Sequence, residues 1–433
     1  MLFEIGLTLL LSITSTPIQQ GKFHPAAAST QSGHLDPIAQ KLFDSAYDLQ
    51  KEGKVYDGLR LYERAIQLAP ESQDIWMEYT VCARKAGYLQ RAVRAGWRTI
   101  ELGPPSDGIW ANLGNAFMVS RAWDAAMKAF EEAAALSNDR HWSAQNFLNL
   151  GYEQLTSGND ALALKTFLHA ITIDPSNALA HIDCGIAKAA GGKNYEGVKE
   201  IKKGMSLLDK KDTTGVEYAQ TALNDIQRKG KIKPFVPSSQ SFQKLPDRFL
   251  TQPVQGTALS LKIDDTVERL WQISPQGVLA ITTPESWRES RDKLESASGD
   301  YSSKQKFTLY EPPYGDEFNL LWSQRQTKES LLDIKSVTEN EGRTALKSST
   351  EDKLELIPII SPSVKGYVFI LTDKKLAGKK HVNHDYPYMI RANLKSEDIF
   401  NKITILSDSR DEAFLKNMLK VLQSIAYSNL GKK

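Results

Sequence analysis

The sequence predicts a multidomain chain: an all-helical solenoid of about five helix-turn-helix repeats, followed by an α+β domain with an antiparallel sheet and a C-terminal helix. Three observations predict it. A pattern of large, small and aromatic residues recurs every 34 residues in the first half of the chain. The helical spacing then stops near residue 230, where a segment rich in Pro, Ser and Lys begins. Beyond it, short stretches rich in β-branched and aromatic residues are bounded by turn residues.

The length of the chain indicates more than one folded domain, and its charge is nearly balanced. A chain of 433 residues exceeds what one compact core usually supports. Its 54 Lys and Arg balance 52 Asp and Glu, which leaves a net charge of +2. The overall charge therefore gives no reason to expect nucleic acid or an anionic membrane as a partner. Cys82 and Cys184 are too few for a disulfide framework, and both fall in helical segments, so we expect buried thiols.

The first 35 residues have some features of a signal peptide. An apolar run from Leu7 to Ile13 precedes Ala26, Ala27 and Ala28, a possible small-residue cleavage zone. Glu4 and the absence of a basic start argue against it. The run is shorter than the roughly 20 apolar residues that span a bilayer. Export to a periplasm or the outside is the favoured expectation, a cytoplasmic location is the alternative, and no stable transmembrane span is expected.

The 34-residue pattern predicts paired antiparallel helices. Small residues at fixed positions let two helices approach, and large ones fill the space between them. Pro70, Pro104 and Pro175 lie where the second helix of a repeat must stop. The pattern is carried by Trp110, Leu113, Gly114, Phe117, Ala126, Phe130 and Ala133 in one period and by Phe147, Leu150, Gly151, Ala163, Phe167 and Ala170 in the next.

These offsets closely resemble the tetratricopeptide repeat (TPR) family over residues 39–211. The repeats are 39–72, 73–106, 107–140, 144–177 and 178–211. A stack of such repeats needs a closing element, and the helical spacing from Thr213 to Lys229 predicts a capping helix. The helical domain is therefore expected to span residues 36–229.

The resemblance implies that the first helix of each repeat lines a concave groove in which side chains at fixed positions face a peptide or protein partner. Amide side chains offer paired donors and acceptors to an extended backbone, and tyrosines add apolar area with a polar tip. Phe43 and Tyr47 stand where some members hold a chaperone's terminal carboxylate with Lys and Asn, so that activity is not implied. The alternative for each groove residue is an exposed side chain without a partner. The chosen groove residues are Tyr47, Asn112, Asn115, Asn149 and Tyr152, and further candidates are Phe43, Asp44, Met77, Glu78 and Arg84.

A basic run crosses the second repeat and allows two interpretations. It either attracts an acidic partner or forms a solvated helix face, and the second is the simpler expectation. Trp97, inside the run, is expected to pack against a neighbouring repeat. The run consists of Arg84, Lys85, Arg91, Arg94 and Arg98.

Residues 230–246 read as a linker, and 247–433 as the α+β domain. One helix is expected from Pro284 to Glu295, and a closing helix, capped by Asp408, Ser409 or Asp411, carries an apolar stripe from Phe414 to Ile425. The expected strands are Thr257 to Ile263, Val278 to Ile281, Phe307 to Leu309, Phe318 to Trp322, Leu354 to Ile360 and Tyr367 to Leu371, with a last one at Tyr388 to Ala392 or Lys402 to Leu406.

The order of these elements resembles the PsbP-like fold, which is shared with the Ran-binding Mog proteins. The similar places are "GVLAITTPESW" (Gly277 to Trp287), "VKGYVFILTDKK" (Val364 to Lys375) and the closing strand and helix. The resemblance implies a non-catalytic adaptor or assembly-factor domain.

The sequence contains no motif for catalysis or phosphate binding. His381, His384 and Asp385 cluster in "HVNHD" and are the weak candidates for a metal site, but the cluster would need further ligands, so neither metal nor cofactor is expected. "EPPYGDEF" (Glu311 to Phe318) reads as a turn between strands.

The leading hypothesis is therefore a non-enzymatic interaction scaffold or assembly factor that binds a peptide or protein partner in the concave groove. The alternative is a small-molecule-binding or catalytic module in the C-terminal domain, which the repeats deliver. The sequence indicates no oligomeric state.

Overall fold

The chain forms two compact units. The computed structural model describes residues 35–209, 211–229, 242–274, 277–289, 305–310, 317–324, 333–378, 386–396, 399–408 and 410–429. One unit comprises residues 1–238 and 245–263, and the other comprises residues 239–244 and 264–433. The expected leader spans residues 1–35, of which residues 1–34 lie outside the described residues.

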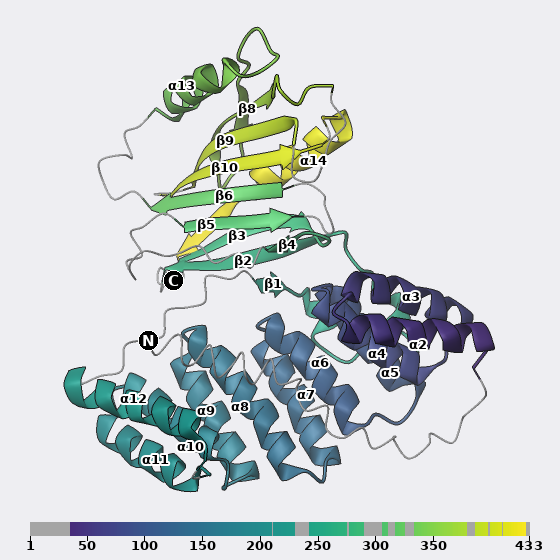
Figure 1. Cartoon of the computed structure of the whole chain (residues 1–433), viewed down its shortest axis with the longest axis vertical. Helices are drawn as coiled ribbons and strands as arrows, with labels where there is room; N and C mark the ends of the chain where they lie inside the picture. The colour runs from purple at the N-terminus through teal and green to yellow at the C-terminus, as the bar shows by residue number, and fades with distance from the viewer. Residues whose placement is uncertain are drawn as a thin grey trace. The chain divides into compact units, whose positions relative to one another are not determined.

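The helical unit consists of antiparallel helix pairs in chain order, which confirms the solenoid of TPR-like repeats (Figure 1). Pro70, Pro104 and Pro175 each follow the end of a second helix by two residues, as the spacing predicts. The first helices are α2 (Pro37–Lys51), α4 (Gln73–Lys85), α6 (Asp107–Val119), α8 (Arg140–Thr156) and α10 (Ala178–Ala190). The second helices are α3 (Val55–Leu68), α5 (Leu89–Leu102), α7 (Trp123–Leu136), α9 (Asp160–Ile173) and α11 (Asn194–Leu207), and α12 (Thr213–Lys229) follows them.

Each first helix begins at a side chain that caps it. The oxygen of the capping residue accepts a hydrogen bond from a backbone N–H in the first turn, which satisfies a donor that the helix itself leaves unpaired. The second helices α3, α5, α7, α9 and α11 have no such side-chain cap. The sequence thus marks where each repeat starts. The caps are Asp36, Ser72, Ser106, Asp139 and Asn177.

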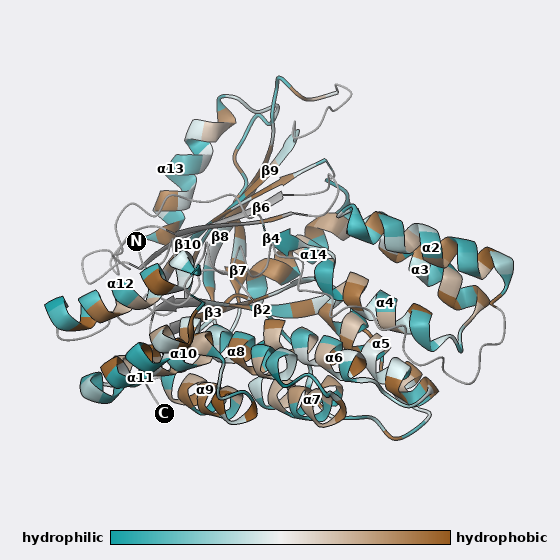
Figure 2. Ribbon diagram, turned by 60° about the horizontal axis from the view of Figure 1, so that its bottom comes forward, coloured by the Kyte–Doolittle hydropathy of each residue, from teal (hydrophilic) through white to brown (hydrophobic). Residues whose placement is uncertain are grey.

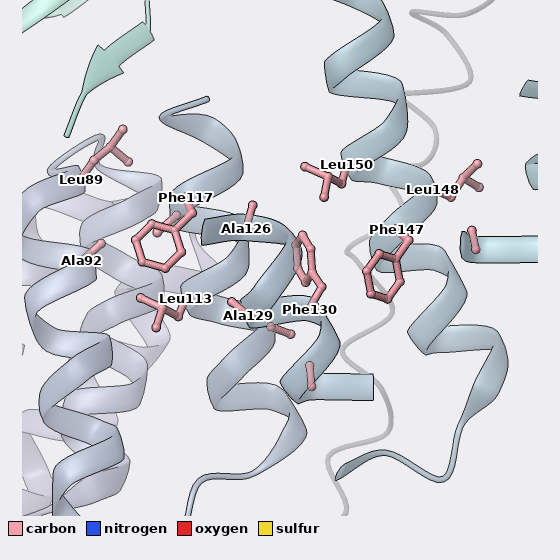
Figure 3. Close-up of a cluster of buried hydrophobic side chains, with 14 of the residues drawn as sticks. Leu89, Ala92, Leu113, Phe117, Ala126, Ala129, Phe130, Phe147, Leu148 and Leu150 are labelled. Atoms are coloured by element: carbon pink, nitrogen blue, oxygen red, sulfur yellow. The ribbon is translucent and has the colours of Figure 1, made fainter. Parts of the chain in front are cut away.

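Within the third, fourth and fifth repeats, the two helices approach closely because a glycine of the first helix faces a large side chain of the second. A Cβ on Gly114 would lie 2.7 Å from the ring of Phe130. Figure 3 shows Phe130 turned toward Phe147 of the next repeat, and their ring centroids are 6.1 Å apart. Each large side chain therefore fills space both within its own repeat and toward the next one.

Successive first helices also contact one another: α2 with α4, α4 with α6, α6 with α8, and α8 with α10. Among the described elements, no two second helices make comparable contact. The first helices therefore line the inner side of the stack, which is the groove that the TPR resemblance implies.

The segment from residue 245 to 263 belongs to the helical unit and packs on α5. Its two 3-10 turns are η1 (Asp247–Phe249) and η2 (Ala258–Ser260). The indole N–H of Trp97 donates to the carbonyl of Phe249 (3.0 Å), and Glu101 accepts from the backbone N–H of Ala258 (2.6 Å). The strand expected from Thr257 to Ile263 is therefore wrong: residues 258–260 form a 3-10 turn that is held on α5 through the backbone and buries Ala258, while Leu259 stays exposed.

The second unit contains two antiparallel sheets, which confirms an α+β architecture. The four-stranded sheet has the order β1 (Phe242–Lys244), β2 (Thr266–Ser274), β3 (Gly277–Pro284) and β11 (Ala426–Asn429). The seven-stranded sheet has the order β4 (Arg288–Glu289), β5 (Gln305–Tyr310), β6 (Glu317–Gln324), β10 (Ile399–Ser407), β9 (Tyr388–Ser396), β8 (Lys365–Thr372) and β7 (Ile357–Ile360). Both alternatives for the last predicted strand are thus strands, β9 and β10.

Helices cover both faces of the seven-stranded sheet (Figure 2). The closing helix α14 (Glu412–Gln423) begins at Asp411, whose carboxylate accepts from the backbone N–H of Phe414 (2.7 Å). Its apolar stripe packs into one core with β-strand residues such as Val368 and Ile403. Helix α13 (Ile334–Leu346) contacts β8 and β9 on the other face, where the alternate strand residues point.

Two parts of this unit differ from the expectation. The helix expected from Pro284 to Glu295 is absent over its described part, because β3 continues to Pro284 and residues 288–289 pair with β5. Residues 290–295 lie outside the described residues. Helix α13 and strands β1, β2, β4 and β11 were not predicted, and β1 lies within the expected linker 230–246.

We predict that Gly185→Ala destabilises the helical unit. A Cβ on Gly185 would lie 2.7 Å from the carbonyl oxygen of Gly197 and 2.8 Å from the amide nitrogen of Ile201, and backbone atoms cannot yield cheaply. Such overpacking costs about 1–3 kcal/mol, more than the gain in helix propensity of about 1 kcal/mol. Urea denaturation followed by circular dichroism measures the change.

Gly108→Ala is the matched control. It also lies in a first helix, but its Cβ would meet no atom closer than 3.8 Å, so we expect unchanged or slightly raised stability. Equal midpoints for the two variants would contradict the packing argument.

Candidate functional site

The five groove residues chosen from the sequence all lie on first helices. Tyr47 is on α2, Asn112 and Asn115 are on α6, and Asn149 and Tyr152 are on α8. All five side chains are half-buried. The repeat register thus brings residues that are distant in sequence to one side of the solenoid.

One position of the repeat carries a carboxylate or an amide in every period: Asp44, Glu78, Asn112, Asn149 and Asp183. Two members of this row, Glu78 and Asp183, are used to tie helices together. Gln50 donates to Glu78 (3.2 Å), which ties α2 to α4, and the Tyr218 hydroxyl donates to Asp183 (2.7 Å), which ties α12 to α10. Asp183 was missed among the candidates, although the 34-residue spacing identifies it.

Asn112 and Asn149, in the middle of the row, and Asn115, one turn of α6 after Asn112, keep hydrogen-bonding capacity. Asn112 and Asn115 are half-buried, and neither amide forms a hydrogen bond within the described chain. Asn149 accepts from Gln145 (3.0 Å), which leaves its own NH2 group to donate. These unused amide donors and acceptors can form hydrogen bonds with a peptide backbone.

The tyrosines differ in their surroundings. The Lys51 ammonium lies 4.1 Å from the ring centroid of Tyr47, close enough for a cation–π contact. Tyr152 is more enclosed: burial, together with the charges of Asp183 and Glu153, raises the pKa of its hydroxyl. It therefore stays a neutral hydrogen-bonding group at physiological pH.

Burial also reduces the negative charge of the groove. It raises the pKa of Asp183 to about 7 against the opposing Tyr218 hydrogen bond. It raises the pKa of Glu78 and of Glu153 as well, although Gln50 and Arg121, respectively, oppose the shift. Asp183, whose pKa lies near neutral pH, therefore carries less than a full negative charge there.

Arg84, in the last turn of α4, is the groove cation without a partner. Its side chain is half-buried, burial lowers its pKa, and its Nε has no hydrogen bond. No acidic side chain of the described residues lies within ion-pair distance of it. An anionic group from outside would complete this site.

The three arginines of the run on α5 are engaged within the helical unit, whereas the side chain of Lys85 is exposed, so the run is neither a simple solvated face nor a free acidic-partner site. Arg91 pairs with Glu63 (3.1 Å). Arg98 pairs with Glu71 (2.8 Å). Arg94 donates to the carbonyl of Leu259 (2.9 Å). Trp97 packs edge-on against Trp110 of the next repeat, which confirms its predicted role.

The other sequence candidates add no site. His381, His384 and Asp385 lie outside the described residues, as does the 311–316 turn. The described ranges hold no group of His, Cys, Asp and Glu that could bind a metal, and no described helix is long and apolar enough to cross a membrane. Cys82 and Cys184 are free, buried thiols, and burial raises their pKa values to about 12 and about 11.

Comparison with known proteins gives matches among solved structures only. No protein-family model matches the chain, and no curated protein matches it at a significant level. The chain is similar to two crystal structures of MamA. One is 22% identical with a TM-score of 0.33 and covers 37% of this chain and 93% of MamA. The other is 19% identical with a TM-score of 0.34 and covers 45% and 97%.

A third similar structure is YrrB, which is described as a TPR protein with an unusual peptide-binding site. It is 16% identical with a TM-score of 0.33 and covers 42% of this chain and 92% of YrrB. Likeness at this level leaves the ligand of the present chain undetermined.

We predict that Asp183→Asn removes a pH dependence of stability. The folded carboxyl has a pKa of about 7, above the unfolded value of about 3.9, so the folded state binds more protons between these values. The wild-type free energy of unfolding should therefore fall as pH rises from about 4 to about 7, by at most about 4 kcal/mol. Asn cannot ionise, and its oxygen can still accept from Tyr218.

Denaturant melts of both proteins at a series of pH values provide the measurement. At pH above about 7, Asp183→Asn should be the more stable protein. Parallel stability–pH curves for the two proteins would contradict the assignment.

Proposed function

We propose that this protein is a non-enzymatic interaction scaffold that binds an extended peptide segment of a protein partner along the first helices of its solenoid. The observation that carries the proposal is the group of half-exposed amides Asn112, Asn115 and Asn149 on adjacent first helices. Packing accounts for their neighbours Leu113, Gly114 and Phe117, which are buried, but not for the amides.

The spacing of the amides suits an extended chain. Packed helices lie about 8–10 Å apart, and an extended peptide advances about 3.3 Å per residue. Asn112 and Asn149 would therefore meet backbone groups about three residues apart on the partner. Because the two amides contact backbone groups, they would set the position of the peptide along the groove. The surrounding side chains would then select the partner's sequence.

Charge favours a partner with an acidic group near the second repeat. Arg84 lies at the end of α4, six residues beyond the row position held by Glu78, or about 9 Å along the helix. Lys85 follows it, and its side chain is exposed. A carboxylate of the partner would replace the water that half-buried Arg84 has lost and form a charge-assisted bond.

An exported location remains part of the proposal, and it rests on the apolar run from Leu7 to Ile13 and on Ala26 to Ala28. Secretion machinery would remove such a leader, so the mature chain should begin after about residue 20. N-terminal sequencing of protein purified from its native source decides this, because an intact Met1 on the mature chain would contradict export.

We predict that replacing Asn112, Asn115 and Asn149 together with Ala weakens partner binding about 100-fold. Each lost hydrogen bond contributes about 1 kcal/mol, and about 3 kcal/mol corresponds to that factor. The test captures partners from extract on the tagged full chain, identifies them by mass spectrometry, and then titrates the purified partner.

The matched control replaces Lys128, Glu131 and Glu132, three exposed residues of α7, a second helix, with Ala. Both variants should keep the far-ultraviolet circular dichroism of the wild type. If the triple Asn variant binds the partner as tightly as the control, the partner does not use the groove.

A further inference from the structure

A cleft opens on the α13 side of the seven-stranded sheet, apart from the solenoid groove. Its volume is about 440 Å³, within the range of sites for small molecules. One wall is α13, with Asn340 and Thr344, and the other side is formed by β8, β9 and β10. All of the lining residues belong to the described part of the α+β unit.

The floor of the cleft is apolar. Phe369 of β8 and Met389 of β9 are diagonal neighbours on one face of the sheet, two residues out of direct register, since Phe369 pairs with Arg391 and Leu371 pairs with Met389. Ala345 of α13 adds a methyl group to the lining. This floor offers apolar contact to a ligand and few hydrogen bonds.

Three charged side chains border the floor, and only one of them lacks a hydrogen-bonded partner. Glu341 of α13 accepts from the Lys402 ammonium (2.6 Å) with one carboxylate oxygen and from the Asn393 amide (3.2 Å) with the other. Arg391 lies 3.9 Å from Glu341, beyond hydrogen-bonding distance. Lys402 and Glu341 therefore neutralise each other, and the cleft keeps one net positive charge, on Arg391.

The Arg391 guanidinium is both enclosed and unsatisfied. Its side chain is 24% exposed, and its Nε is buried with no hydrogen bond. Burial lowers its pKa, and the distant Glu341 only partly offsets this. An anionic ligand therefore gains more binding free energy from this partly dehydrated guanidinium than from a fully hydrated one.

We propose that this cleft binds a small amphiphilic monocarboxylate, with the carboxylate on the Arg391 guanidinium and the apolar chain over Phe369 and Met389. A single free positive charge matches a single negative charge. A phosphate dianion would need a second free cation, and Lys402 is engaged by Glu341. The site is independent of the solenoid groove, so the two proposals stand or fall separately.

Octanoate is the probe, and octanamide is its neutral counterpart. The full chain is labelled at the methionine ε-methyl groups, and the Met389 signal is assigned with Met389→Leu. We expect octanoate to shift the Met389 signal saturably and octanamide to bind about tenfold more weakly, because the neutral amide oxygen accepts a weaker hydrogen bond from a guanidinium than a carboxylate does.

Two substitutions should move the octanoate affinity in opposite directions. Arg391→Met removes the free charge and should weaken binding about tenfold or more. Glu341→Gln removes the only carboxylate among the lining residues and should tighten binding several-fold, an effect that general loss of structure cannot produce. Arg343→Gln is the control, since Arg343 is exposed and pairs with Glu339 of the same helix (2.6 Å).

The proposal is overturned if octanoate leaves the Met389 signal unmoved up to its solubility limit. It is equally overturned if octanamide binds as tightly as octanoate, or if Glu341→Gln and Arg391→Met shift the affinity in the same direction.

Discussion

The close approach of two helices within each repeat is the constraint on which the helical unit depends. It is set by a small residue on the first helix and a large one on the second, as with Gly114 and Phe130, Gly151 and Phe167, or Gly185 and Ile201. The second repeat reverses the sizes: Thr80 stands on the first helix and Gly96 on the second, where Leu113 of the next repeat comes close. The combined size of the two facing side chains fixes the separation of the two helices. This separation in turn aligns the first helices along one side of the solenoid.

The sequence predicted the repeats well because their determinants are local and periodic. Caps, glycines and prolines recur at fixed offsets, so one repeat supports the next. Two elements that lack such a local, periodic pattern could not be predicted. The 245–263 segment has apolar residues without a period, and its conformation is decided by a distant residue, Trp97. The fully buried residues of helix α13 are Thr338 and Gly342, a polar residue and a glycine, so its sequence shows no stripe of large apolar side chains.

The functional residues illustrate the same limit. Position within the repeat placed Asn112 and Asn149 on the first helices, but the sequence could not separate them from Glu78 and Asp183 in the same row. That distinction depends on tertiary partners, Gln50 and Tyr218. Whether a charged side chain has a partner also depends on tertiary structure. Arg84 and Arg91 look equivalent in the sequence, yet only Arg91 has an acidic partner, since α3 presents Glu63 to it.

The path of the chain decides how either unit can be studied alone. The chain passes from one unit to the other after residues 238, 244 and 263. A fragment that ends at residue 229 would lack Phe249 and Ala258, both fully buried, and would leave the indole N–H of Trp97 without its acceptor. A fragment that begins at residue 247 would lack β1 and expose an edge of β2. Each unit therefore contains a segment that lies beyond its apparent sequence boundary, and binding measured on either simple fragment would reflect a surface that the whole protein covers.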